Sequence, residues 1–185
     1  MNFPLDSIDD GYKFQQIIAE YFRSLKTDKH GYKISNINVE DSGVGGDDGC
    51  DIIVEFYFED AICEHTQRWI VECKSQKKAV GSRDINTNNI ETILRAKNAS
   101  GYLLVCKNDA TASLKRIFSD LNNRNGCKYM VWNGSQLWHK IMERKNILKA
   151  FFPDFYRHNF SNTDIESKYN ELINEFNEKF KRELE

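Results

Sequence analysis

The sequence predicts an α/β fold with one mixed central sheet, flanking helices and a further amphipathic helix at the C-terminal end. One observation is that three strand-like segments follow one another before helices and strands begin to alternate. Another is that 40 % of the 185 residues are hydrophobic, which is enough for a packed core. Strands joined by short links pair antiparallel and strands joined through a helix pair parallel, so we expect an antiparallel first part and a parallel last part.

The N-terminal part is expected to form one helix and three strands. Residues 11–25 place apolar side chains at spacings of three and four, the pattern of a helix with one buried face. Residues 32–39, 51–58 and 67–74 are rich in apolar residues or alternate between apolar and polar ones, which is typical of strands. The polar link between the second and third segments favours an antiparallel hairpin.

The following part alternates between helices and strands. Apolar spacing predicts helices at residues 84–99, 112–122 and 135–145, and short apolar runs predict strands at residues 101–106 and 128–132. Ser135 stands where the last of these helices would begin and is a candidate for its N-cap.

The tail of the chain is expected to form a separate part. A boundary near Pro153 divides a main α/β domain, residues 1–153, from a linker and helix, residues 154–185. In the tail, apolar residues recur at three-to-four spacing among many charges, which predicts an amphipathic helix that needs a partner surface. It could pack on its own domain, pair with a second subunit, or lead into a further sensor or NTPase module.

Composition narrows the class of protein. No stretch approaches the roughly 18 consecutive apolar residues of a membrane span, and the N-terminus lacks the features of a signal peptide, so a cytoplasmic protein without membrane contact is expected. The five cysteines show no C-x-x-C spacing, which favours reduced thiols over a disulfide or zinc framework. The net charge of −2 gives no overall nucleic-acid signal, although basic residues cluster after the third strand.

Two charged residues lie inside the otherwise apolar third strand. Glu72 and Lys74 are two residues apart, so their side chains point to the same side, and Asp51 opens the preceding strand. Burying such charges is costly unless they are paired or bind a metal. Carboxylates and the backbone carbonyl of Cys73 suit Mg²⁺ or Mn²⁺, and a neighbouring lysine can stabilise charge on a phosphate. The pattern therefore predicts a site for phosphodiester cleavage, with a buried ion-pair cluster as the alternative.

Five short segments between Gly11 and Cys106 carry a resemblance to a known family. They are Gly11-Tyr12-Lys13-Phe14, Gly31-Tyr32, Gly46-Asp47-Asp48-Gly49-Cys50-Asp51-Ile52, Val71-Glu72-Cys73-Lys74 and Val80-Gly81. In these segments the chain resembles the Mrr-type restriction endonucleases, a branch of the PD-(D/E)xK nuclease superfamily. The resemblance implies a restriction-endonuclease-like core and a Mg²⁺-dependent DNA endonuclease, in which Mn²⁺ can replace Mg²⁺, with the site on one edge of the sheet.

Two positions depart from the pattern of that family. Related nucleases often have a glutamate where this chain has Gln15, so the accessory carboxylate is lost or its catalytic role passes to an amide. Many Mrr-type members have a glutamine where this chain has Glu72, and the charged residue favours tight binding of the first ion. The polar residues after the third strand are candidates for DNA contacts, or a solvated loop: Gln76, Lys77, Lys78, Ser82 and Arg83.

The function expected from these observations is metal-dependent hydrolysis of DNA in antiviral defence or defence against other foreign DNA. Cutting both strands requires two sites, so a homodimer or higher oligomer is expected. Two alternatives stay open: a nuclease-fold module that binds DNA or acts as a scaffold without hydrolysis, and a nuclease that acts on RNA or branched DNA. No helix-turn-helix or zinc-finger pattern predicts sequence specificity.

Overall fold

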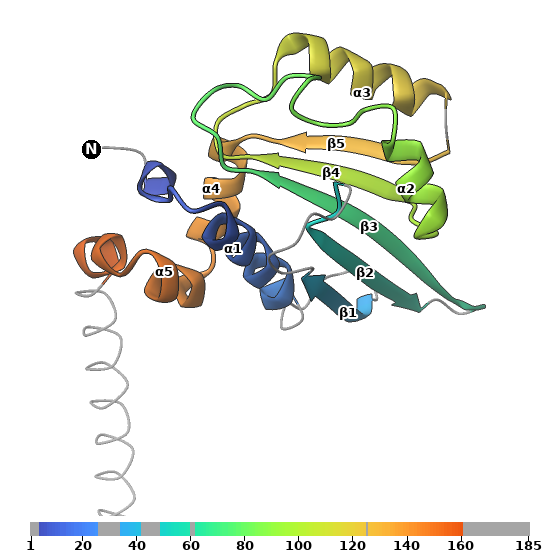
Figure 1. Ribbon diagram of the computed structural model, residues 1–185. Coiled ribbons are helices and arrows are strands. Elements are labelled where there is room, and N and C mark those ends of the chain that lie inside the picture. Colours follow the sequence, from blue (N-terminus) through green and yellow to red (C-terminus); the bar gives the residue numbers. More distant parts are fainter. Residues whose placement is uncertain (1–3, 26–33, 42–48, 60–61, 125, 161–185) are drawn as a thin grey trace, which may run out of the picture. The chain divides into compact units, whose positions relative to one another are not determined.

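The computed structural model describes residues 4–25, 34–41, 49–59, 62–124 and 126–160. The chain divides into two compact units, residues 1–147 and 148–185. Within the described part of the first unit, five strands form one sheet in chain order (Figure 1). They are β1 (Ile34–Asp41), β2 (Ile52–Glu59), β3 (Glu64–Lys74), β4 (Gly101–Cys106) and β5 (Lys128–Trp132).

The sheet is mixed, as the sequence predicts. β1, β2 and β3 pair antiparallel, whereas β4 pairs parallel with both β3 and β5. The change of direction follows the connections, because only residues 60–63 separate β2 from β3, whereas helices separate the later strands. All six residues of β4 are buried, as expected for a parallel strand covered on both faces.

Helices cover both faces of the sheet. The helical segments are η1 (Pro4–Ser7), α1 (Gly11–Ser24), α2 (Ile90–Ala96), α3 (Ala112–Arg124), α4 (Gly134–Met142) and α5 (Lys145–Phe151). The ring of Phe22 in α1 stacks on Trp132 of β5 with the ring centres 5.7 Å apart, and Lys140 of α4 lies over the same ring. Phe118 of α3 contacts Tyr102 of β4 edge-on at 5.9 Å. Side chains alternate along a strand, so α1 and α4 lie on one face and α2 and α3 on the other (Figure 1).

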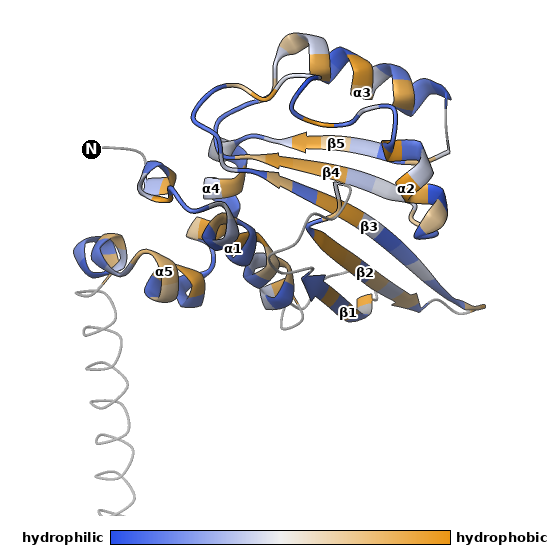
Figure 2. Ribbon diagram, viewed as in Figure 1, coloured by the Kyte–Doolittle hydropathy of each residue, from blue (hydrophilic) through white to orange (hydrophobic). Residues whose placement is uncertain are grey.

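The local sequence accounts for α1 and for the polar end of β3. The Asp10 carboxylate accepts a hydrogen bond of 2.9 Å from the backbone N–H of Tyr12 and caps the helix. The apolar stripe of the helix is buried at three-to-four spacing. The half of β3 that begins at Glu64 is hydrophilic and mostly exposed, and the half toward Lys74 is largely buried (Figure 2).

Two local predictions were wrong. The helix predicted at 84–99 begins only at Ile90, because residues 82–89 form successive turns, with the N–H of Asp84 bonded to the Gly81 carbonyl at 3.0 Å. This segment is rich in Asn and Thr, whose side chains favour turns over helix interiors. Asn133, not Ser135, caps α4, since it forms a reciprocal capping box with Gln136.

The tail is described only in part. Residues 153–160 are helical, and the rings of Tyr156 and Phe160 stack at 5.6 Å. The remaining tail, where the amphipathic helix is predicted, lies outside the described residues. In the described ranges, no helix has both the length and the apolar character needed to cross a membrane.

Candidate active site at the carboxyl end of β3

Glu72 and Lys74 form an ion pair at the carboxyl end of β3. The ammonium nitrogen of Lys74 lies 2.7 Å from Oε1 of Glu72. The Glu72 side chain is 5 % exposed and the Lys74 side chain is 29 % exposed, so the carboxylate is buried while the ammonium reaches solvent. Both side chains point to the sheet face covered by α2 and α3, because they share that face with Ile70 of the core.

Asp51 lies beside this pair, just before β2. Ile52 pairs with Val71, so Asp51 stands across from Glu72 at the end of the ladder. The Asp51 N–H donates to the Val71 carbonyl at 3.1 Å, and the Cys73 N–H donates to Oδ2 of Asp51 at 2.6 Å. Two carboxylates and one ammonium therefore come together at one end of the β2–β3 pair.

The inner oxygen of Glu72 is enclosed by the protein. The hydroxyl of Tyr102 on β4 donates a hydrogen bond to Oε2 of Glu72. The backbone of Gly49 also approaches closely, since a Cβ atom placed there would lie 3.2 Å from the same oxygen. Gly49 has a φ of +89°, a conformation that suits glycine. Glu72 thus directs Oε1 toward Lys74 and Oε2 into the protein.

Gln15 reaches the site from α1 and holds the backbone around Asp51. Its side-chain nitrogen donates to the Asp51 carbonyl oxygen at 2.8 Å and to Oδ1 of Asp41 at 2.6 Å. Gln15 is buried, and Asp41 is the last residue of β1. Sequence reasoning missed Asp41, although an acidic residue that ends a strand before a glycine-rich loop is a signal that could have identified it.

The local charges act on the pKa values of two neighbours. Burial lowers the pKa of Lys74, but the hydrogen bond and the charge of Glu72 outweigh it, so the pKa of Lys74 is raised overall. Burial and the charge of Glu72 both raise the pKa of Tyr102. At neutral pH, Lys74 is an ammonium and Tyr102 a hydrogen-bond donor in this structure.

The candidate DNA contacts divide into two groups. Gln76 is part of the loop itself, because its side-chain nitrogen donates to Oδ2 of Asp84 at 3.2 Å. The same carboxylate oxygen accepts the Gly81 N–H at 2.6 Å, and the hydrogen bonds from Gly81 and Gln76 lower the pKa of Asp84. The other candidates are exposed: Lys77, Lys78, Ser82 and Arg83. Lys77 also lies 3.4 Å from the carboxylate of Asp9.

The chemistry of the donor set fits a hard divalent cation. Among the described residues, no three Asp, Glu, His or Cys side chains are arranged to hold a metal ion. Mg²⁺ is commonly held by only one or two carboxylates, with waters and substrate phosphates completing the shell. Asp51 and Glu72 supply two carboxylates, and the carbonyl of Cys73 is the additional oxygen predicted from the sequence. These donors suit Mg²⁺ or Mn²⁺.

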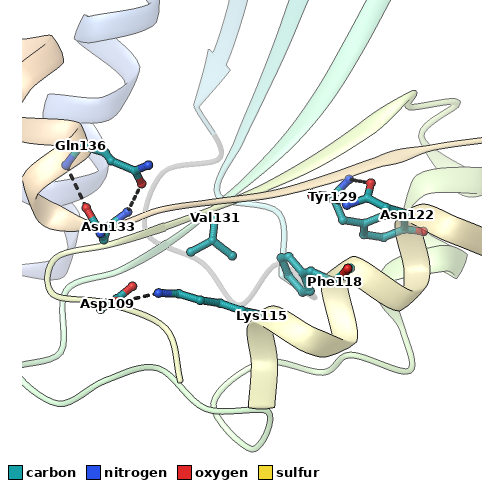
Figure 3. Close-up of a pocket in the computed structure, with 9 residues that line it drawn as sticks. Asp109, Lys115, Phe118, Asn122, Tyr129, Val131, Asn133 and Gln136 are labelled. Carbon is teal, nitrogen blue, oxygen red and sulfur yellow. Dashed lines mark hydrogen bonds and ion pairs between the residues drawn. The ribbon is translucent and has the colours of Figure 1, made fainter. Parts of the chain in front are cut away.

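A pocket of about 330 Å³ lies elsewhere, between α3, β5 and the start of α4 (Figure 3). None of the predicted site residues lines it. At one end of the pocket, the Asn122 side chain forms hydrogen bonds with both backbone groups of Tyr129 (Figure 3). Its oxygen accepts from the Tyr129 N–H at 2.8 Å and its nitrogen donates to the Tyr129 carbonyl at 2.9 Å, so both groups of this residue in the edge strand β5 have a partner. The pocket and the candidate active site are therefore separate features.

One family model and two solved structures are similar to this chain. The family model Mrr_cat, described as restriction endonuclease, matches residues 5–139. Among solved structures, the chain is similar to the DNA modification-dependent restriction endonuclease AspBHI, at 12 % identity and a TM-score of 0.40, covering 80 % of this chain and 39 % of that one. It is also similar to the MspJI restriction endonuclease in complex with a 27-mer oligonucleotide, at 10 % identity and a TM-score of 0.49, covering 80 % and 32 %. The chain thus spans well under half of these two chains, and no curated protein matches it.

Proposed function

This chain belongs to the Mrr_cat family of restriction endonucleases, and on that premise we propose that it hydrolyses DNA phosphodiester bonds with Mg²⁺, which Mn²⁺ can replace. The observation that carries the proposal is the buried Glu72 carboxylate paired with Lys74 and placed across the strand ladder from Asp51. A buried carboxylate is costly, and a second carboxylate beside it adds repulsion unless a cation is shared between them.

Each residue has a distinct part in this proposal. Asp51, Glu72 and the Cys73 carbonyl would hold the cation, which when bound polarises the phosphoryl oxygen and lowers the pKa of a water molecule. Lys74 has three N–H donors, so it can keep its bond to Glu72 while donating another to a phosphate oxygen and stabilising the charge that develops there. Gln15 would keep the Asp51 backbone in place from α1.

The exposed basic residues after β3 support DNA as the substrate. Lys77, Lys78 and Arg83 follow the site strand directly and are open to solvent. Exposed cations next to a cleavage site are suited to phosphate contacts, whose strength falls as salt rises. The wider role we propose is defence against foreign DNA, with a homodimer or higher oligomer supplying two sites for a double-strand break.

A plasmid-nicking assay tests the proposal. The intact chain is incubated with supercoiled plasmid in Mg²⁺, Mn²⁺ or EDTA, and compared with Lys74→Ala and with Lys128→Ala, which changes an exposed lysine of β5. We expect cleavage in both metals, none in EDTA, and a loss of about 100-fold or more for Lys74→Ala only, by analogy with other groups that stabilise a transition state. Equal cleavage by the intact chain and Lys74→Ala would eliminate the assignment.

The same assay separates the alternatives. A chain that shifts the mobility of DNA but does not nick it in either metal is a binding or scaffolding module. A panel of single-stranded, duplex and branched DNA with RNA then identifies the substrate, and preferential cleavage of RNA or branched DNA would replace duplex DNA in the proposal.

A further inference from the structure

Tyr102 is a buried tyrosine whose hydroxyl meets the carboxylate of the candidate site. It lies on β4, opposite Ile70 in the parallel register, so its side chain is on the same face of the sheet as Glu72. Its hydroxyl donates to Oε2 of Glu72, and the residue is 0 % exposed. The proposed cleavage reaction does not itself require this residue.

Core packing alone does not account for a tyrosine at this position. The ring contacts Phe118 edge-on, and a phenylalanine ring could make the same contact. A hydroxyl group buried in an apolar core is costly unless it is hydrogen-bonded, and a buried carboxylate oxygen has the same requirement. The Tyr102 hydroxyl and Oε2 of Glu72 satisfy each other's need for a hydrogen bond, and this accounts for a tyrosine at this position.

We propose that Tyr102 is a positioning residue, which orients the Glu72 carboxylate so that Oε1 alone faces the divalent cation. This inference rests on the proposed function. The glutamate side chain has three rotatable bonds, and the β3 backbone places only its first atom. The Tyr102 hydroxyl holds Oε2 from within the protein, and Gly49 lies close to the same oxygen, because a Cβ atom added at Gly49 would be 3.2 Å from it.

In this arrangement, Asp51 and Glu72 would each offer one carboxylate oxygen to the cation before it binds. Hydrogen bonds that orient the ligands of a metal typically contribute 10–100-fold to its affinity. Tyr102→Phe removes one oxygen atom and keeps the ring, so Glu72 would lose the bond that orients it while Lys74 stays in place. We therefore expect Mn²⁺ binding to weaken by about 10–100-fold in this variant.

The experiment measures Mn²⁺ binding to the full chain by calorimetry, without DNA. Tyr129→Phe is the matched control, because Tyr129 is buried and its ring contacts the same Phe118 at 6.0 Å. The expected result is a weaker affinity for Tyr102→Phe and an unchanged one for Tyr129→Phe. In plasmid cleavage, the Mn²⁺ concentration for half-maximal rate should rise by the same factor, with a much smaller change in the rate at saturating Mn²⁺.

Thermal unfolding distinguishes positioning from a general loss of packing. A ligand stabilises the folded protein according to its concentration relative to its Kd, so the rise in Tm on adding Mn²⁺ should be smaller in Tyr102→Phe than in the intact chain. Equal affinity and an equal rise in Tm would overturn the inference, even if the Tm in EDTA falls. Failure of the proposed function itself would appear in the intact chain, as no Mn²⁺ binding and no cleavage, and would remove the basis of the inference as well.

Discussion

Replacing Gly49 with alanine tests how closely the backbone at Gly49 is fitted to the Glu72 carboxylate. Gly49 has a φ of +89°, and an added Cβ would lie 3.2 Å from Oε2 of Glu72 and 3.8 Å from Cδ1 of Ile93. An L-residue forced into the left-handed region costs about 1–2 kcal/mol, and the close contact requires Glu72 to move as well. The variant should therefore be less stable and have a displaced carboxylate.

Gly49→Ala should lower both the stability and the activity of the chain. For a protein of this length, 1 kcal/mol corresponds to roughly 2–4 °C in Tm, so we expect Gly49→Ala to lower the Tm by roughly 2–8 °C. A misplacement of about 1 Å in a catalytic site can cost about 100-fold in rate, so cleavage should fall by up to that factor. The measurements are thermal unfolding in EDTA and plasmid cleavage in Mn²⁺.

Gly126→Ala is the control for this prediction. Among the described residues, and apart from its own chain neighbours, no atom lies within 4 Å of a Cβ placed at that position, so the added methyl group meets open space. Its Tm and cleavage rate should match those of the intact chain within error. If Gly49→Ala were as stable and as active as Gly126→Ala, the close approach of Gly49 to Glu72 and the reasoning built on it would be refuted.

The remaining predictions concern the polar contacts around the sheet. Hydrogen bonds from Asn38 and Arg68 lower the pKa of Glu55 below its usual 4.5, so this group should stabilise the fold above pH 4.5 and lose that contribution as the pH falls through the lowered value. The difference in unfolding free energy between the intact chain and Glu55→Gln should therefore shrink in acid. A difference that stays constant down to pH 2 would contradict the lowered pKa of Glu55. Gln15→Glu should destabilise the chain in EDTA by about 1–3 kcal/mol, because it removes a donor and sets a carboxylate beside Asp41, and added Mn²⁺ should reduce the loss. Urea unfolding gives the free energy of unfolding for both comparisons. An unchanged free energy of unfolding for Gln15→Glu in EDTA would show that the Gln15 hydrogen bonds do not stabilise the fold.

Local sequence patterns predicted the elements whose signals lie within a few residues. The strands at 101–106 and 128–132 have the predicted bounds, because each is a short apolar run with clear ends. The contact between Glu72 and Lys74 follows from the two-residue period of a strand. The helix predicted at 84–99 was too long because apolar spacing was given more weight than the turn-forming Asn and Thr side chains.

Contacts that depend on strand register were not predictable from local patterns. Gln15 meets Asp41 across 26 residues, and Tyr102 meets Glu72 across 30 residues. Both contacts require the order and offset of the strands, which no short window of sequence contains. For the same reason Tyr102 was absent from the candidate residues and the contact of Asp41 with Gln15 was not foreseen, whereas Asp51 was found from the motif that precedes an apolar strand.

The most direct test of the account is the position of a bound Mn²⁺ ion, found by anomalous diffraction from crystals of the intact chain soaked in Mn²⁺. We expect a peak contacted by the Asp51 carboxylate, Oε1 of Glu72 and the Cys73 carbonyl. A peak held by other residues, or no peak from protein that cleaves DNA in the same Mn²⁺ concentration, would contradict it.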